Sequence, residues 1–460
     1  MDFQTSPAFA ESLDSQDPLA RFRLRFVIPD PDLVYLDGNS LGRLTQASAE
    51  RVHTLVAEEW GRELIRGYNQ DWWSAPGRVG EKIARLVGAG PGQVVACDTV
   101  STNLFKLTSA ALALRPGRTR IITDTLNFPS DLYVLQGLVR MLGGEYEIVR
   151  IPSRDGDISP DLDAFATALD ERTALVTFSH VVFKSGYLYD MAAISAQAHK
   201  AGALVLWDLS HAVGAVPVNL DACAADFAIG CTYKYLNGGP GSPAFLYVRK
   251  ELQDQVVSPI WGWWGQDQPF AFGLDYTPAP GITRFLSGSQ PILSMLAMEA
   301  ALDPLLEAGM EALREKSLLL SEYLIYLSDN LLTPLGFSLG SPRDPGRRGS
   351  HVSIRHPEGY RINRALIEEL NLIPDFREPD NLRLGLTPLY TTFSEVWEGV
   401  DRIRRVVAEK RYENYSLEKL TVPENGPCHY ETSIKAGRSN LPAAYAEKKN
   451  ELEDRPSVQI

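Results

Sequence analysis

Residues able to do chemistry follow two short apolar runs near the middle of the chain. Leu204–Trp207 is followed by Asp208, and Phe227–Cys231 is followed within three residues by Lys234. Apolar runs of this length, bounded by Gly, Asp and Pro, are typical of strands buried on both faces of a sheet. Because ligands of open α/β sheets bind outside the carboxyl ends of the strands, we expect Asp208 and Lys234 to face one crevice. This pair suits pyridoxal 5′-phosphate (PLP) chemistry, in which a lysine binds the cofactor covalently and a carboxylate keeps its pyridine nitrogen protonated.

Two earlier strand-to-helix junctions carry residues suited to binding a cofactor. The strand pattern QVVACDT leads into a helix whose first turn holds Ser101, Thr102 and Asn103. Free N–H groups and the helix dipole favour phosphate at such a start, although ordinary N-capping explains the same residues. Phe128 follows the predicted strand 120–123, where its ring could stack on a flat cofactor or anchor the loop on the core.

A tight turn and an aromatic group precede these junctions. In VYLDGNSLG, Gly and Asn tolerate positive φ, and we expect a turn that brings Asn39 and its neighbours close to another part of the chain. Residues 46–65 have a helical apolar period and predict one amphipathic helix. Tyr68, Trp72 and Trp73 follow in a predicted loop, where they could pack in a core or interface, or line an aromatic substrate pocket.

The alternation of strand and helix patterns predicts an α/β fold with a mostly parallel, doubly wound sheet. We expect an N-terminal arm (1–45), a large domain (46–300) and a smaller α+β C-terminal domain (301–410). Residues 411–460 are polar, with Pro and Lys/Glu runs and no sustained period. They predict an extended or disordered tail, with a surface-wrapping arm as the alternative.

The composition and net charge of the chain argue against several classes of function. The chain has 460 residues, 44% of them hydrophobic, and a formal net charge of −13, which argues against a nucleic-acid partner. No apolar stretch approaches the roughly 20 residues of a membrane span, and the acidic start has no hydrophobic signal region. We therefore expect a cytoplasmic protein without a membrane partner. The four cysteines have no disulfide or metal-ligand spacing, and we expect no metal.

Several motifs, in their order along the chain, resemble the kynureninases. They are YLDGNSLG, NLFK, NFPSDLY, SHVVFKSG, WDLSHAVGAVPVNL, TYKYLNGGPGSPAFLYV, GWWGQ, FLSGSQPIL and REPDNLRLGLTPLY. The similarity covers roughly Tyr35–Arg404, and so many matches in order are much more specific than one alone. The resemblance implies PLP fold type I, with PLP as cofactor.

The resemblance also implies residue roles. Lys234 would bind PLP and move the substrate α-proton, Asp208 would pair with the pyridinium nitrogen, and Tyr233 would act as acid and base. These are the predicted catalytic residues. Arg383 would hold the substrate α-carboxylate through a two-bond fork. The predicted cofactor-binding residues are Val100, Ser101, Phe128, Pro129, Ser130, Asp131, Ser179, Asp208, His211, Tyr233, Lys234, Trp263 and Ser289. The predicted substrate-binding residues are Arg383, Tyr68, Gly288, Ser289 and Asn39.

The implied reaction is hydrolysis of L-kynurenine, or of its 3-hydroxy derivative, to anthranilate or 3-hydroxyanthranilate and L-alanine in tryptophan degradation. Family members build their site from two subunits, so a homodimer is implied, with Trp263 and Ser289 supplied by the neighbour. One alternative is another enzyme of the same fold, an aminotransferase or a cysteine desulfurase, which would need a nucleophilic cysteine on a mobile loop. Another is a catalytically silent binding module, against which the retention of Lys234, Asp208 and Arg383 argues.

Overall fold

The structure is a computed structural model that describes residues 2–418. A compact unit ends at Tyr415, and the elements below belong to it. Within the segment predicted as a tail, Arg411–Asn414 form a short 3₁₀ helix of this unit. Residues 419–460 of that segment lie outside the described residues.

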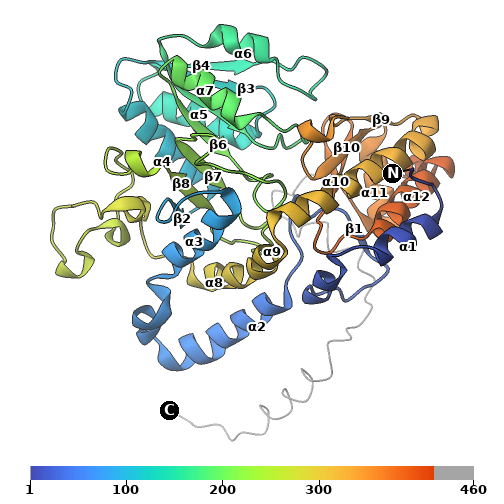
Figure 1. The fold of residues 1–460 in the computed structure, drawn as a ribbon, viewed down its shortest axis with the longest axis horizontal. Coiled ribbons are helices and arrows are strands. Elements are labelled where there is room, and N and C mark those ends of the chain that lie inside the picture. The colour runs from blue at the N-terminus through green and yellow to red at the C-terminus, as the bar shows by residue number, and fades with distance from the viewer. Residues whose placement is uncertain (1, 419–460) are drawn as a thin grey trace, which may run out of the picture. The chain divides into compact units, whose positions relative to one another are not determined.

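A seven-stranded sheet forms the centre of the large N-terminal part (Figure 1). Its order is β2-β8-β7-β6-β5-β3-β4, and the pairs from β7 to β4 are all parallel. Only β8 runs opposite to the others, because it pairs antiparallel with both β7 and β2. The predicted mostly parallel sheet is confirmed. The strands are β2 (Val94–Ala96), β3 (Arg120–Asp124), β4 (Glu147–Ile151), β5 (Thr173–Ser179), β6 (Leu204–Asp208), β7 (Phe227–Gly230) and β8 (Phe245–Val248).

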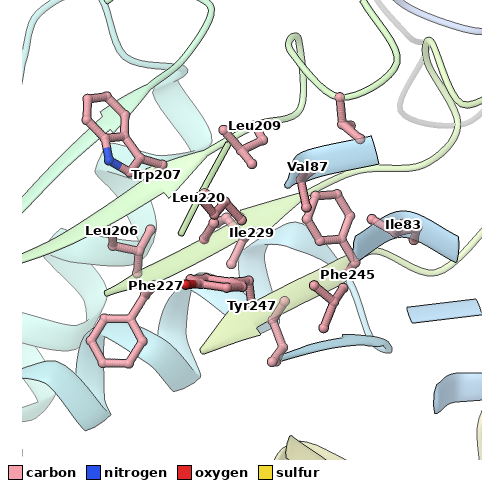
Figure 2. Close-up of a cluster of buried hydrophobic side chains, with 14 of the residues drawn as sticks. Ile83, Val87, Leu206, Trp207, Leu209, Leu220, Phe227, Ile229, Phe245 and Tyr247 are labelled. Carbon is pink, nitrogen blue, oxygen red and sulfur yellow. The ribbon is translucent and has the colours of Figure 1, made fainter. Parts of the chain in front are cut away.

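Helices between the strands pack on this sheet. Helix α4 packs against β5, β6, β7 and β8 and also against α5, while α7 packs against β6. Figure 2 shows part of the resulting core, in which side chains of β6, β7 and β8 meet Ile83 and Val87 of α3. The helices of this part are α2 (Gln46–Thr54), α3 (Ala75–Val87), α4 (Val100–Ala113), α5 (Pro129–Met141), α6 (Leu162–Ala168), α7 (Met191–Lys200), α8 (Ile292–Ala301) and α9 (Asp303–Ala308).

Two local predictions were wrong in this part. The single helix predicted for 46–65 ends as an α-helix at Thr54 and continues as a π-helix, Leu55–Glu63. The predicted loop after it contains a second π-helix, Tyr68–Trp72. Helix α3 then starts at Ala75 with a proline in its first turn, where the missing N–H costs no helical hydrogen bond.

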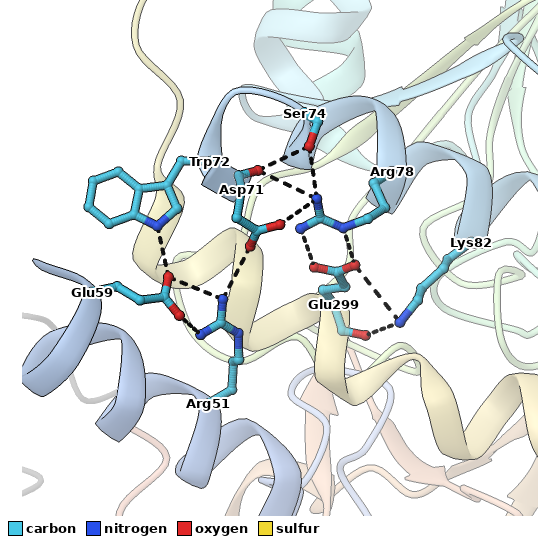
Figure 3. Close-up of polar contacts among 8 residues, drawn as sticks. All are labelled: Arg51, Glu59, Asp71, Trp72, Ser74, Arg78, Lys82 and Glu299. Atoms are coloured by element: carbon cyan, nitrogen blue, oxygen red, sulfur yellow. Dashed lines mark hydrogen bonds and ion pairs between the residues drawn. The ribbon is translucent and has the colours of Figure 1, made fainter. Parts of the chain in front are cut away.

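Polar contacts join the wide turns to one another and to neighbouring helices. Glu59 pairs with Arg51 and accepts a hydrogen bond of 2.9 Å from the Trp72 indole N–H (Figure 3). Arg78 of α3 forms a two-bond fork with Glu299 of α8, at 2.7 and 2.9 Å. These partners lie in five separate helical elements, so local periodicity could not reveal them.

The C-terminal part has its own sheet and core. Four antiparallel strands lie in the order β12-β13-β10-β9, and β1 pairs parallel with β11. A second hydrophobic cluster fills the space between these strands and the helices. The elements are β1 (Val34–Tyr35), β9 (Ser338–Leu339), β10 (His351–Arg355), β11 (Leu372–Ile373), β12 (Asp375–Arg377), β13 (Asn381–Gly385), α10 (Met310–Leu327), α11 (Gly359–Glu369) and α12 (Phe393–Ala408).

The N-terminal segment packs on this C-terminal part. Helix α1 (Pro7–Ser15) lies against α12, and the Asp14 carboxylate accepts hydrogen bonds from the backbone N–H groups of Phe393 and Ser394. Thr392 and Glu395 complete a capping box at the same helix start. The division into an arm and two domains stays a prediction. Among the described residues, no helix is both long and apolar enough to cross a bilayer.

Candidate active site

A cavity of about 450 Å³ lies at the carboxyl ends of the sheet strands. It collects residues that follow five strands, β2, β3, β5, β6 and β7. Ten of the predicted cofactor residues line it: Val100, Ser101, Phe128, Ser130, Asp131, Ser179, Asp208, His211, Tyr233 and Lys234. Nine further residues complete the wall: Asp98, Thr99, Ser210, Cys231, Gly241, Ser242, Pro243, Ala244 and Pro291.

The lysine of the cavity is held by a buried histidine. Lys234 Nζ lies 2.9 Å from His211 Nε2 and 5.9 Å from the centre of the Phe128 ring. Burial, followed by the Lys234 cation, holds the pKa of His211 well below its usual range. His211 is therefore neutral, and its Nε2 can accept a hydrogen bond from the lysine.

The tight turn that the motif VYLDGNSLG predicts packs against the backbone at this lysine. Gly42 N–H donates to the Tyr233 carbonyl at 2.8 Å. A Cβ atom on Gly42 would lie 2.3 Å from the Lys234 carbonyl oxygen, so a side chain there would displace the lysine backbone. Glycine at this position thus permits a close backbone contact that fixes the position of the Lys234 backbone.

Two buried carboxyl groups lie together opposite the lysine. Asp208 ends β6, and its Oδ1 accepts from Ser210 N–H at 2.9 Å and from Ser210 Oγ at 2.6 Å. Ser179 Oγ lies 3.4 Å from its other oxygen. Asp131 lies in the first turn of α5, and its Oδ2 has no hydrogen-bond partner among the described residues. Burial, and then the Asp208 charge, raise the pKa of Asp131 well above its usual range.

The opposite end of the cavity suits an anion. Thr99 caps α4 by accepting from Thr102 N–H at 3.2 Å, and the following residues, Val100 and Ser101, lie in the wall. Ser101 Oγ and Ser130 Oγ, at the starts of α4 and α5, are 3.2 Å apart. Two helix starts with adjacent hydroxyl groups offer donors and positive helix-dipole ends to one phosphate group.

These residues fit PLP. The orphaned Asp131 oxygen, the paired Asp208 carboxylate and the lysine line one cavity, and Phe128, which is 40% exposed, lies in the same wall. The hydroxyl-lined helix starts would take the phosphate group, and Asp208 the ring nitrogen.

The remaining predicted cofactor residues, Pro129, Trp263 and Ser289, lie outside the cavity wall. Trp263 is part of an aromatic cluster, with its ring centre 5.2 Å from that of Trp73. Trp73 stacks on Trp264 at 4.5 Å, and the Tyr68 ring centre is 6.0 Å from that of Trp264. Pro129, Gly288 and Ser289 also lie outside the wall. Tyr68 is thus brought to the tryptophans rather than to the lysine.

Arg383 lies in β13, fully buried. Its guanidinium pairs with Asp375, donates to the Phe183 carbonyl, and has Ser40 Oγ 3.3 Å away. Its charge contributes to lowering the pKa of His211, so its field reaches the residue that holds Lys234.

Asn39 is also fully buried and belongs to the same region of the C-terminal part. Its side-chain amide has no hydrogen-bond partner among the described residues. A Cβ atom on Gly385, at the end of β13, would lie 1.9 Å from the Asn39 Oδ1 atom.

Comparisons with known proteins agree with this geometry. Residues 313–403 match the family model of the kynureninase C-terminal domain. A kynureninase of Pseudomonas fluorescens is 45% identical over 406 residues, which are 87% of this chain and 95% of that one. The chain belongs to the kynureninase family. A second member, from Burkholderia pseudomallei (strain 1106a), is 44% identical over 86% of this chain and 94% of its own.

Solved structures with the same fold include enzymes outside the kynureninases. A cysteine desulfurase from Thermococcus onnurineus NA1 matches with a TM-score of 0.71 at 18% identity, over 87% of this chain and 98% of its own. The Escherichia coli cysteine desulfurase CsdA matches with a TM-score of 0.72 at 19% identity, over 85% and 98%. At this identity the likeness shows the fold alone, and the predicted fold class is confirmed.

Sequence reasoning overlooked parts of the kynureninase-family site. Ser210 follows Asp208 by two residues, the spacing at which a hydroxyl and an N–H reach back to an Asp side chain. Asp98 stands at the exit of β2, directly before the Thr99 cap. Both residues lie within two residues of a predicted strand end or helix cap, so the sequence alone could have identified them as site residues.

Proposed function

We propose that this kynureninase-family chain is a PLP-dependent hydrolase that converts L-kynurenine to anthranilate and L-alanine. The observation that carries the proposal is the single cavity in which Lys234, neutral His211 and the Asp131–Asp208 pair meet two helix starts. The curated relatives named as kynureninases, at 44–45% identity over most of the chain, support the reaction class.

Each cavity residue then has a task. Bound PLP supplies an electron sink that makes the bonds around the substrate α-carbon labile. Lys234 takes and returns the α-proton, and His211, being neutral, accepts a hydrogen bond from its ammonium form. Asp208 is assigned the pyridine nitrogen, and Ser210 holds its carboxylate through two hydrogen bonds, from the N–H and from Oγ.

Tyr233 is assigned the proton transfer at the γ-carbonyl. Burial raises the pKa of Tyr233, so the phenol is protonated at neutral pH and can donate to the carbonyl oxygen as water adds. Arg383 is assigned the α-carboxylate, which its planar fork can bind with two hydrogen bonds. Arg383 stands opposite Ser353 of β10, two residues from His351, whose ring is 5.5 Å from that of His211, and this supports a position at the substrate end.

The cysteine desulfurase alternative lacks a suitable thiol among the described residues. Cys97, Cys223 and Cys231 are all buried. Burial raises the pKa of Cys97 to about 12 and that of Cys223 to about 11, and it also raises that of Cys231. A persulfide-forming enzyme needs an accessible thiolate, which none of these supplies. Cys428 lies outside the described residues.

We also assign this chain to a homodimer with shared sites, in the cytoplasm. Five large hydrophobic side chains are exposed on one segment, Trp261, Trp263, Phe270, Phe272 and Leu274, as expected of a face that a partner covers. Supply of Trp263 and Ser289 by the neighbouring subunit would explain why neither lies in the cavity wall of its own chain. Free buried thiols suit a reducing compartment.

The decisive experiment combines activity with absorbance. The wild-type chain should release fluorescent anthranilate from kynurenine and gain the visible absorbance band of lysine-bound PLP. Lys234→Ala should lose both, whereas Lys200→Ala, at an exposed position of α7, should keep both. Comparing kcat/KM for kynurenine and 3-hydroxykynurenine then assigns the preferred substrate. Persulfide formation from cysteine without anthranilate release would refute the proposal.

A further inference from the structure

A fully buried lysine outside the cavity is bound on three sides. Lys106 lies on α4 with 0% exposure. Its Nζ is 2.6 Å from Asp98 Oδ2, 2.7 Å from the Phe285 carbonyl oxygen and 3.7 Å from Cys97 Sγ. An ammonium group has three N–H donors, and all three are used. Such complete pairing is what allows a cation to remain buried.

The carboxylate paired with this lysine lies in the cavity wall. Asp98 stands directly before the Thr99 cap of α4, at the end of the cavity that suits phosphate. Its φ of 51° is in the left-handed region, which Asp tolerates better than most residues. An unpaired carboxylate here would repel a phosphate group, so its neutralisation by Lys106 decides the potential at this end.

The same pair ties a second segment to the cavity. Besides the bond from Lys106 to the Phe285 carbonyl, Ser287 Oγ donates to Asp98 Oδ1 at 3.3 Å. The Ser287 carbonyl in turn accepts from Trp264 N–H at 3.2 Å. The segment 285–289 and the tryptophan loop are therefore anchored at the start of α4.

We propose that Lys106 is a positioning residue that neutralises Asp98 and thereby creates an anion site at the start of α4. This proposal rests on the proposed function, because the anion is the PLP phosphate. Lys106 touches neither substrate nor cofactor and acts through Asp98, Phe285 and Ser287.

The test compares two ligands that differ only in the phosphate. PLP and pyridoxal are titrated into the cofactor-free chain, and binding is followed by the visible absorbance band. Lys106→Met should weaken PLP binding by roughly 10- to 100-fold, since it leaves an uncompensated carboxylate beside the phosphate, and should change pyridoxal binding much less. Lys106→Met combined with Asp98→Asn should restore PLP binding to within a few-fold of wild type.

A matched control is available in the other core. Lys316 of α10 is also buried and pairs with Asp17 at 2.6 Å, but neither lies in the cavity wall. Lys316→Met should reduce stability without changing the PLP-to-pyridoxal affinity ratio. An equal loss for both ligands in Lys106→Met, or failure of the double variant to recover the ratio, would overturn the proposal.

If Lys106→Met does not fold, the single variant Asp98→Asn still tests the proposal. Asn can still accept from Lys106 while the positive charge remains, so this variant should bind PLP severalfold more tightly relative to pyridoxal. An unchanged or reduced affinity for PLP relative to pyridoxal contradicts the proposal. If the wild-type chain gains no absorbance band with PLP, the proposed function itself fails. If the wild-type chain binds PLP and the variants have the same PLP-to-pyridoxal affinity ratio as wild type, only the Lys106 proposal is refuted.

Discussion

The two adjacent carboxyl groups of the cavity allow a sharp prediction about charge. Asp131 is 2% exposed, and burial together with Asp208 raises its pKa well above the usual range. Ser210 N–H and Ser210 Oγ both donate to Asp208, whereas Asp131 Oδ2 accepts no hydrogen bond from the described residues. We therefore expect the proton shared by the pair to reside on Asp131.

The magnitudes follow from this assignment. Two unit charges about 4 Å apart at an effective dielectric constant of about 20 repel by about 4 kcal/mol, enough to keep one proton on the pair. Asp131→Asn replaces a neutral acid by a neutral amide and should change kcat/KM by less than about 10-fold, or about 1.4 kcal/mol. Asp208→Asn removes the charge facing the pyridine nitrogen and should cost about 3–5 kcal/mol, roughly 10²–10⁴-fold in kcat.

The pH dependence of stability provides a second readout. A raised pKa in the folded state means that the folded chain holds a proton which the unfolded chain releases as pH rises above the usual carboxyl range. The contribution of Asp131 to stability is therefore lost as pH rises toward its raised pKa. Urea unfolding of the cofactor-free chain should show Asp131→Asn gaining stability relative to wild type as pH rises above the usual carboxyl range, from about pH 4 upward. Equal catalytic losses in the two variants, or no pH-dependent gain, would show that Asp131 carries the charge.

Two further predictions concern the substrate and the partner subunit. Arg383→Lys should lower kcat/KM for kynurenine by roughly 10- to 100-fold, through loss of charge-assisted hydrogen bonds worth about 1.5–3 kcal/mol, and should not alter inhibition by an analogue lacking the α-carboxylate; equal effects on both ligands would contradict the assignment. Mixing Lys234→Ala and Trp263→Ala chains, each inactive alone, should restore about a quarter of wild-type activity, since half of the dimers are hybrid and each has one intact site. No recovery after verified subunit exchange would show that sites are not shared.

The meeting of Asp208 and Lys234 was predictable because it depends on strand order alone. β6 and β7 are parallel neighbours, with Asp208 opposite Ile229, so residues following the two strands emerge at one edge. Buried apolar runs identify such strands without knowledge of distant contacts. The edge strand β4 was missed because its residues are mostly half-exposed and include polar side chains, which weakens the apolar run.

The wide helical turns near Tyr68 were beyond a reading of the sequence. Their periodicity resembles that of an ordinary amphipathic helix, and π-helical turns are rare, so the sequence favoured a single α-helix. The contacts from Glu59 to Arg51 and to Trp72 span 8 and 13 residues. Propensity carries no information about pairs at that separation.

The sequence pattern does indicate the two buried charged residues, although neither buried ion pair was predicted. In NLFKLTSAALAL, Lys106 stands on an apolar helix face, and a lysine there requires a partner. Asp98, just before the cap of the same helix, is the nearest carboxylate in sequence. Arg383 follows the same logic, because the turn EPDN makes β12 and β13 a hairpin in which Asp375 stands directly opposite Arg383. Charged residues inside apolar patterns, each searched against the nearest cap or hairpin partner, would therefore have located both buried ion pairs, Lys106–Asp98 and Arg383–Asp375.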